Sequence, residues 1–129
     1  MNSLEKVTIN VNAVDLGQID LLVKEGFYSN RTDFIKTAIR NQLKAHDLSI
    51  RDVIVRKEYS VGIVSYSKKD LEECLAKGIK LDIKVVGMLV LKDNIPIDLA
   101  VKTINSIDVS GIFKCNDDLR KALSNIICN

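Results

Sequence analysis

Three polar side chains that could hydrogen-bond a nucleic-acid base alternate with apolar residues near the N-terminus. Residues 5–12 read EKVTINVN, and Lys6, Thr8 and Asn10 supply an ammonium, a hydroxyl and an amide. Each of these groups can donate or accept a hydrogen bond at a base edge. The solvent side of an ordinary edge strand would show the same alternation, so this pattern alone leaves both interpretations open.

The residue types give little support to catalysis or metal binding. His46 is the single histidine, and Cys74, Cys115 and Cys128 are scattered without a C-x-x-C pair. This removes the usual general base and disfavours a zinc site. Glu72 and Glu73 are adjacent, so they point in different directions on a helix. Neither G-x-x-x-x-G-K-[ST] nor G-x-G-x-x-G occurs. We therefore expect no enzyme, no catalytic residue, no metal and no cofactor.

Composition and charge narrow the class of protein. Hydrophobic residues make up 47% of the 129, which is enough for a packed core, and the net charge is only +2. No apolar run reaches the roughly 18 residues of a membrane span, and MNSLEKVTIN lacks the pattern of a signal peptide. Scattered cysteines are typical of reduced proteins. The sequence predicts a cytoplasmic protein without a membrane partner, and it shows no strong basic excess.

A strand and two helices are expected to position these polar groups. Val7, Ile9 and Val11 alternate with the polar residues, which predicts a strand with one buried face. Apolar residues then recur at helical spacing up to Gly26, which is suited to end a helix. Asn30, or alternatively Ser29, can cap a second helix. Its apolar stripe comprises Phe34, Ile35, Ala38, Ile39 and Leu43.

A strand that stands alone in a short segment needs a partner. It cannot pair its own backbone groups, and a unit of about 40 residues buries too little surface to be stable alone. Both problems disappear if two chains pair their strands antiparallel and interlock their helices. The resulting two-stranded ribbon has a size that fits the DNA major groove.

The first 46 residues resemble the ribbon-helix-helix repressors of the MetJ, Arc and CopG type. The similarity lies in KVTINVN at 6–12 and GFYSNRTDFIKTAIRNQL at 26–43. It implies a transcriptional regulator that binds double-stranded DNA as a homodimer or a higher even-numbered homo-oligomer. It also implies roles for individual positions. Base contacts would come from Lys6, Thr8 and Asn10, phosphate contacts from Ser29, Asn30 and Arg31, and the dimer core from Val7, Ile9, Val11, Leu22, Phe34, Ile35, Ala38 and Ile39. Residues 1–46 carry six basic and five acidic side chains, so phosphate neutralisation by one dimer would be modest.

The remaining residues contain an apparent repeat. Residues 47–58 fit a helix better than a strand. Gly62, Gly87 and Gly111 then recur, each followed by a short apolar strand. An Asp-Leu pair follows each strand, at Asp70, Asp98 and Asp118, and these aspartates or Asp117 could cap helices. Eight residues after each leucine stands an isoleucine, at positions 79, 107 and 127. The pattern predicts a parallel sheet, buried on both faces and covered by helices.

The predicted fold class is α+β. A ribbon-helix-helix dimerisation module at 1–46 precedes a small α/β domain of three strand-loop-helix repeats at 47–129, which would serve assembly or effector sensing. The favoured function is a sequence-specific DNA-binding regulator. An antitoxin remains an alternative, although antitoxin tails are usually disordered before they bind. A second alternative is a structural or assembly protein that uses the ribbon-helix-helix module only to dimerise.

Overall fold

The computed structural model describes residues 4–128, which form two compact units, residues 4–53 and 54–128. The first unit contains an irregular segment, then helices α1 (Ala13–Lys24) and α2 (Arg31–Ala45) and most of α3 (Asp47–Arg56). The helix expected within 47–58 is thus confirmed. The predicted boundary after residue 46 falls at the junction between α2 and α3.

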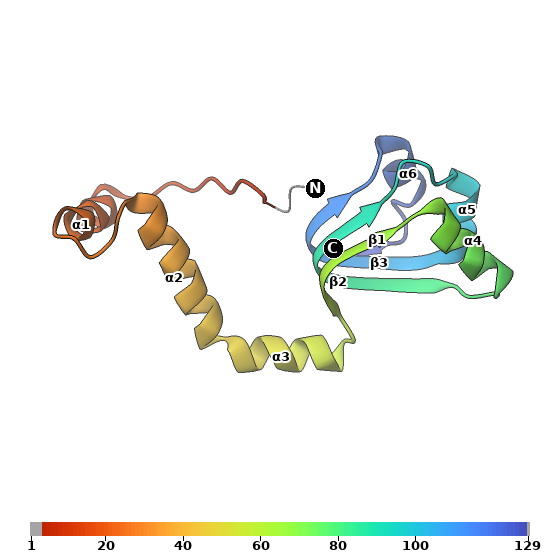
Figure 1. Cartoon of the computed structure of the whole chain (residues 1–129), viewed down its shortest axis with the longest axis horizontal. Helices are drawn as coiled ribbons and strands as arrows, with labels where there is room; N and C mark the ends of the chain where they lie inside the picture. The colour runs from red at the N-terminus through yellow and green to blue at the C-terminus, as the bar shows by residue number, and fades with distance from the viewer. Residues whose placement is uncertain (1–3, 129) are drawn as a thin grey trace. The chain divides into compact units, whose positions relative to one another are not determined.

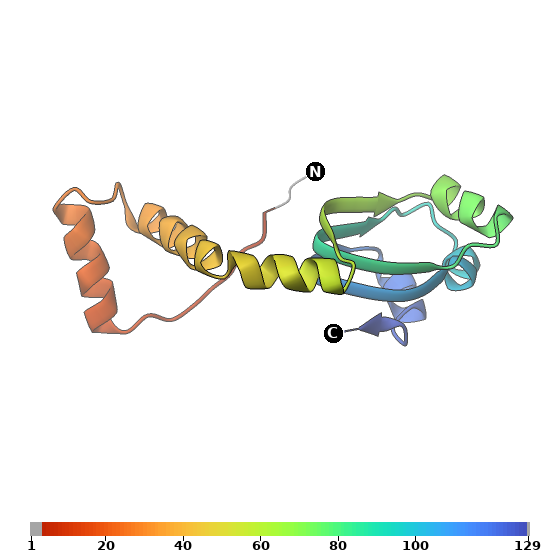
Figure 2. The same ribbon diagram turned by 90° about the horizontal axis from the view of Figure 1, so that it is seen from below.

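Local sequence signals explain where α1 and α2 begin and end. The Asn12 and Asn30 side chains accept from the amides of Asp15 and Asp33, each at 2.8 Å. At the end of α1, Gly26 adopts φ 85°, where a side chain would be strained. The Phe27 amide then reaches back to the Leu22 carbonyl at 2.9 Å. Figure 2 shows the short turn that joins the two helices.

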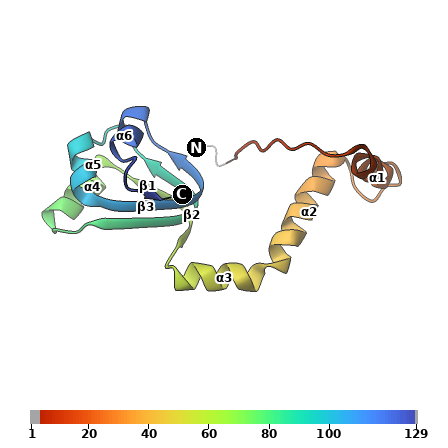
Figure 3. The same ribbon diagram turned by 180° about the vertical axis from the view of Figure 1, so that it is seen from behind.

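The second unit is a parallel sheet with helices between its strands. Its elements are β1 (Ser60–Tyr66), α4 (Lys68–Ala76), β2 (Leu81–Leu91), α5 (Ile97–Thr103), β3 (Ile104–Lys114), α6 (Asp117–Ala122) and β4 (Ile127–Cys128). The strand order is β1-β2-β3-β4, and every neighbouring pair is parallel. Helices α4, α5 and α6 lie together against the sheet (Figures 1 and 3). The predicted parallel sheet covered by helices is confirmed.

The core of this unit lies between the sheet and its helices. Leu71, Leu99 and Leu119, one from each helix, are all buried. They pack with alternate residues of β2 such as Leu89, because successive strand residues point to opposite faces. Every buried hydrophobic side chain that the structure describes lies between Leu71 and Leu123.

The three aligned glycines lie side by side in the sheet. Gly62 pairs with Gly87, and Gly87 pairs with Gly111. All three have φ between 124° and 136°, and a Cβ on Gly87 or Gly111 would overlap the carbonyl of the preceding glycine. The strands extend to both sides of the glycines, so the apolar run after each glycine is only part of its strand. The isoleucine alignment also fails, because Ile107 pairs with Ile83 and Ile127 and not with Ile79.

Two further expectations about this unit were wrong. Burial on both faces does not hold for β1, where Val61 and Ile63 remain 66% and 58% exposed. They point away from the core face, on which Val64 and Tyr66 pack, and β1 has a neighbouring strand on one side only. The expected aspartate caps are also wrong. Ser67 caps α4, with Asp70 in the reciprocal position of a capping box, and Asn116 caps α6. Pro96 precedes α5 without a side-chain cap.

Candidate nucleic-acid interface

The segment that was predicted to form the ribbon is unpaired in the single chain. Residues 4–11 form neither helix nor strand, and the side chains of Lys6, Thr8 and Asn10 are exposed. The intervening apolar residues are exposed as well, with Val7 at 80% and Ile9 at 68%. The predicted strand needs a second chain, so it stays a prediction about the dimer.

The helices of this unit also lack a core of their own. No side chain between residues 4 and 53 is buried. Of the predicted dimer-core residues, Leu22 and Phe34 are half-buried, while Val7, Ile9, Val11, Ile35, Ala38 and Ile39 are exposed. A cavity of about 370 Å³ lies within this unit, and Val11, Ile19, Leu22 and Phe34 are among the residues that line it. The unit therefore presents an apolar surface that a second copy could cover.

The start of α2 brings together the three residues predicted to contact phosphate. Ser29, Asn30 and Arg31 are all exposed at this end. Asn30 is the N-cap, which excludes Ser29 from that role. The Ser29 amide instead donates to the Asp33 carboxylate at 2.9 Å. Helix N-termini bind anions through their amides, and in the single chain the Ser29 amide already has an anionic acceptor in Asp33.

Arg31 is already engaged with α1. Its guanidinium donates twice to the Asp20 carboxylate, with both distances 2.8 Å. This hydrogen-bonded pairing lowers the pKa of Asp20 and raises the pKa of Arg31. The pair fixes the α1–α2 turn from residues eleven apart in the sequence. Sequence reasoning missed it, because nothing in the pattern at 20 and 31 marks the two residues as partners.

Aromatic packing supports the same turn. The rings of Tyr28 and Phe34 meet edge to face, with centroids 5.1 Å apart. This contact holds the chain before α2 against the first turn of the helix. The amide groups of residues 29–31 are therefore presented by a defined local structure.

Metal binding and membrane insertion have no comparable arrangement of side chains in the described residues. Among residues 4–128, no three His, Cys, Asp or Glu side chains gather where they could hold a metal ion. No helix in this part of the chain is long and apolar enough to cross a bilayer.

The first unit therefore combines an N-terminal segment outside any strand, two capped helices and an exposed apolar surface. Comparison with known proteins agrees. The chain matches the Ribbon-Helix-Helix transcriptional regulator family over residues 2–120 and belongs to that family. An uncharacterized protein of Methanocaldococcus jannaschii is 32% identical over 87 residues, which cover 66% of this chain and 79% of the relative. No solved structure matches the chain.

Proposed function

We propose that this protein is a sequence-specific DNA-binding transcriptional regulator that acts as a homodimer or a higher even-numbered oligomer. Membership of the family supports the class of function. The observation that supports a dimer is that no side chain between residues 4 and 53 is buried. A segment of this size with exposed Val7 and Ile9 gains its core only by burying that surface against a second copy.

The DNA-reading surface would form only in the dimer. Two copies of residues 5–12 pair antiparallel, and Val7, Ile9 and Val11 turn toward the helices. Lys6, Thr8 and Asn10 then point away from the core, because side chains alternate along a strand. A two-stranded ribbon fits the major groove, where ammonium, hydroxyl and amide groups can contact base edges.

The phosphate contacts would come from the backbone at the start of α2. The amides near Ser29, Asn30 and Arg31 and the positive end of the helix favour an anion there, and at Ser29 a phosphate would replace the Asp33 carboxylate as acceptor. The Arg31 guanidinium is held by Asp20, so the Arg31 amide is the better candidate contact. Such contacts position the dimer on the duplex without reading its sequence.

The C-terminal unit would serve assembly or effector sensing, without catalysis. The coincidence of three glycines in one sheet register supports its description as three strand-loop-helix repeats. Its helices and strands bury their own core, so this unit does not need the disorder-to-order transition that is usual for an antitoxin tail. A cytoplasmic location and action as a repressor complete the proposal.

The test is a DNA-binding series at stated salt concentration. DNA fragments selected by the purified wild-type protein supply the site, and Lys6→Ala and Thr8→Ala are then measured on that site. Lys102→Ala is the matched control, because Lys102 is an exposed cation in the last turn of α5, in the unit that is not proposed to contact DNA. We expect both ribbon variants to bind the selected site more weakly and the control to bind as the wild type does.

The outcomes separate the proposed function from its alternative. Equal affinity of all four proteins for the site would contradict the ribbon interpretation. Failure of the wild type to select any sequence would contradict sequence-specific binding and would favour a structural role. Recovery of an inverted repeat would support a two-fold symmetric dimer on its operator.

A further inference from the structure

Gly62 differs from the other two glycines of the sheet in its surroundings. A Cβ on Gly87 or Gly111 would overlap the carbonyl of the preceding strand, whereas a Cβ on Gly62 meets no atom within 4 Å. Yet Gly62 adopts φ 124°, the same value as Gly111. Gly62 thus has the backbone geometry of close strand approach on the outer edge of β1, where the described chain supplies no strand.

The opposite side of the sheet offers a matching edge. β4 pairs with β3 only at Ile107 and Asp108, while β3 continues to Lys114. Among the described residues, no strand covers β3 beyond Asp108. The unit therefore has one open edge along β1 and a second along the last part of β3.

We propose that the C-terminal unit assembles head to tail, with β1 of one copy paired in parallel to β3 of a second copy. The internal register gives the alignment, because Gly62 pairs with Gly87 and Gly87 with Gly111. Continued by one strand, this register places Gly62 of the second copy beside Gly111. Ser60 then lies beside Val109, the first position that β4 as described leaves open, and Ser65 lies beside Lys114.

The first turns of the helices beside these edges have net charges of opposite sign. The internal stack places α4 next to α5 and α5 next to α6. The same stack would place α4 of the second copy next to α6. The first turn of α4 carries Lys68, Lys69 and Asp70, a net charge of about +1, and the first turn of α6 carries Asp117 and Asp118. Opposite charges would therefore meet at the contact, which favours this pairing over two like ends.

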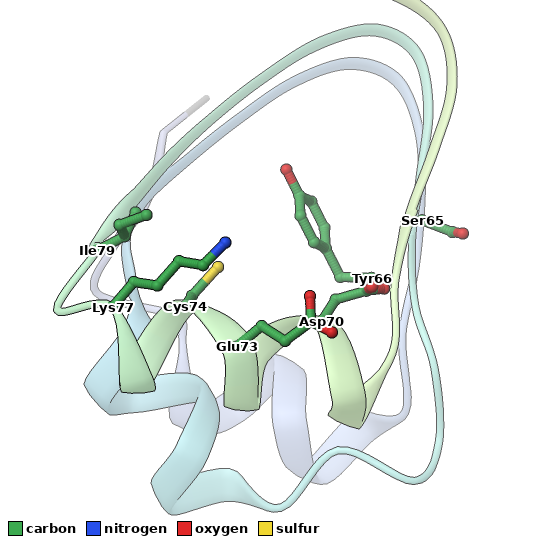
Figure 4. A pocket seen from close by; sticks show the side chains of 7 residues that line it. All are labelled: Ser65, Tyr66, Asp70, Glu73, Cys74, Lys77 and Ile79. Carbon is green, nitrogen blue, oxygen red and sulfur yellow. The ribbon is translucent and has the colours of Figure 1, made fainter.

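A cavity also lies at each end of the row of strands and helices in this unit. At the first end, a cavity of about 300 Å³ is lined by β1 and α4, and Figure 4 shows Tyr66, Cys74 and Lys77 around it. At the last end, a cavity of about 420 Å³ is lined by Val109, Gly111 and Phe113 of β3 and by Arg120 after them. These cavities lie where the next strand and helix of the stack would pack.

Arg120 would have to move when a strand docks. Its guanidinium donates to the Phe113 carbonyl at 2.6 Å and lies 4.6 Å from the centre of the Phe113 ring. Arg120 is exposed, so its movement leaves no buried charge unpaired. In the single chain, this side chain covers part of an edge that could otherwise pair indiscriminately.

Head-to-tail pairing leaves one open edge at each end, so it can continue from copy to copy. This goes beyond the proposed DNA binding, because it gives the C-terminal unit the role of linking dimers. Dimers on neighbouring sites would then reinforce one another, which suits a module with almost balanced charge.

Disulfide cross-linking of the full chain tests the register. The native cysteines are first replaced by Cys74→Ser, Cys115→Ala and Cys128→Ser. Val61→Cys and Ser110→Cys are then combined, because the proposed register makes these positions neighbours in two copies. Within one chain they lie two strands apart, roughly 9.6 Å, which is beyond disulfide reach. Val61→Cys with Ile112→Cys is the control, shifted by two residues, and Val61→Cys alone tests pairing between two β1 strands.

The expected result is a ladder of linked dimers and larger species for the Val61–Ser110 pair only. The proposal is overturned if the shifted control or the single variant links as readily, or if no variant links. Adding Thr8→Ala should weaken DNA binding and preserve the ladder, so failure of the proposed function is distinguishable from failure of this inference.

Light scattering on the uncross-linked chain supplies a second measurement. Gly62→Ala should lose the species larger than the dimer, because its Cβ would meet the Gly111 carbonyl of the docked copy. Gly78→Ala is the control, because Gly78 also has positive φ, 67°, and its Cβ would meet nothing within 4 Å. Circular dichroism verifies that both variants fold. A folded Gly62→Ala protein that still forms the larger species would contradict the proposal.

Discussion

The two units of this chain solve the problem of small size in different ways. Residues 54–128 bury a set of leucine, isoleucine and valine side chains between a parallel sheet and three helices. Residues 4–53 bury no side chain at all, although their helices are capped and their turn is fixed by an ion pair. Good local structure therefore does not amount to a stable unit, and the missing core of the first unit points to a second chain.

The largest expected effects come from removing a large apolar side chain from each unit, which tests whether the two units have separate cores. Leu89→Ala should lower the free energy of unfolding of the C-terminal unit by about 2–5 kcal/mol, because it leaves a cavity in a closed core. Ile9→Ala should instead weaken dimerisation and leave that unit unchanged. Denaturant unfolding at several protein concentrations distinguishes the two effects. Equal responses from both variants would mean that the units share one core.

A second test compares glycines within the C-terminal unit. Gly87→Ala should destabilise the sheet strongly, because its Cβ would overlap the Gly62 carbonyl. Gly62→Ala shares nearly the same φ, 124°, but its Cβ meets no neighbour in the chain, so only the backbone strain remains and the loss should be smaller. Thermal unfolding measures both. Similar losses would show that positive φ alone, and not close strand approach, explains the aligned glycines.

Removing one helix N-cap from each unit tests the same difference with a smaller expected loss of stability. Asn30→Ala and Asn116→Ala should each cost about 1 kcal/mol, because each removes an acceptor for a helical amide. For Asn30, the loss should appear in the concentration-dependent transition of the dimer. For Asn116, it should appear in a transition that is independent of concentration. If both fall in one transition, the two units unfold together.

The smallest expected effects are those of acid. Bonds from Asn105 and Ser106 hold the pKa of Asp82 below its usual range, and Arg31 lowers that of Asp20. A depressed folded pKa adds stability that is present above the unfolded pKa, ordinarily 3.8, and is lost as pH falls through the folded value. Asp82→Asn should therefore make acid unfolding of the C-terminal unit less steep. Circular dichroism during acid titration checks this, and an unchanged slope would contradict it.

The sequence predicted what depends on local or periodic signals. Asn30 as a cap, the turn at Gly26 and the alignment of Gly62, Gly87 and Gly111 all follow from residue type and spacing, and the structure contains each of them. The family resemblance likewise led to the family that the chain matches.

Contacts between distant residues could not be predicted in this way. The Arg31–Asp20 pair crosses a turn, and β4 adds only two residues to the sheet, too few to give a periodic pattern. The caps at Ser67 and Asn116 were assigned to neighbouring aspartates, because any of these side chains can accept from a helix amide. The roles of Lys6, Thr8 and Asn10 depend on a partner chain and on DNA, so they remain predictions.

Amide hydrogen exchange of residues 6–11 in the full chain, followed over a range of protein concentrations, tests the central claim most directly. These amides belong to no strand in the single chain. Pairing between two copies predicts protection at high concentration that disappears on dilution. Absence of protection at every concentration, or protection that dilution does not change, would contradict the shared ribbon.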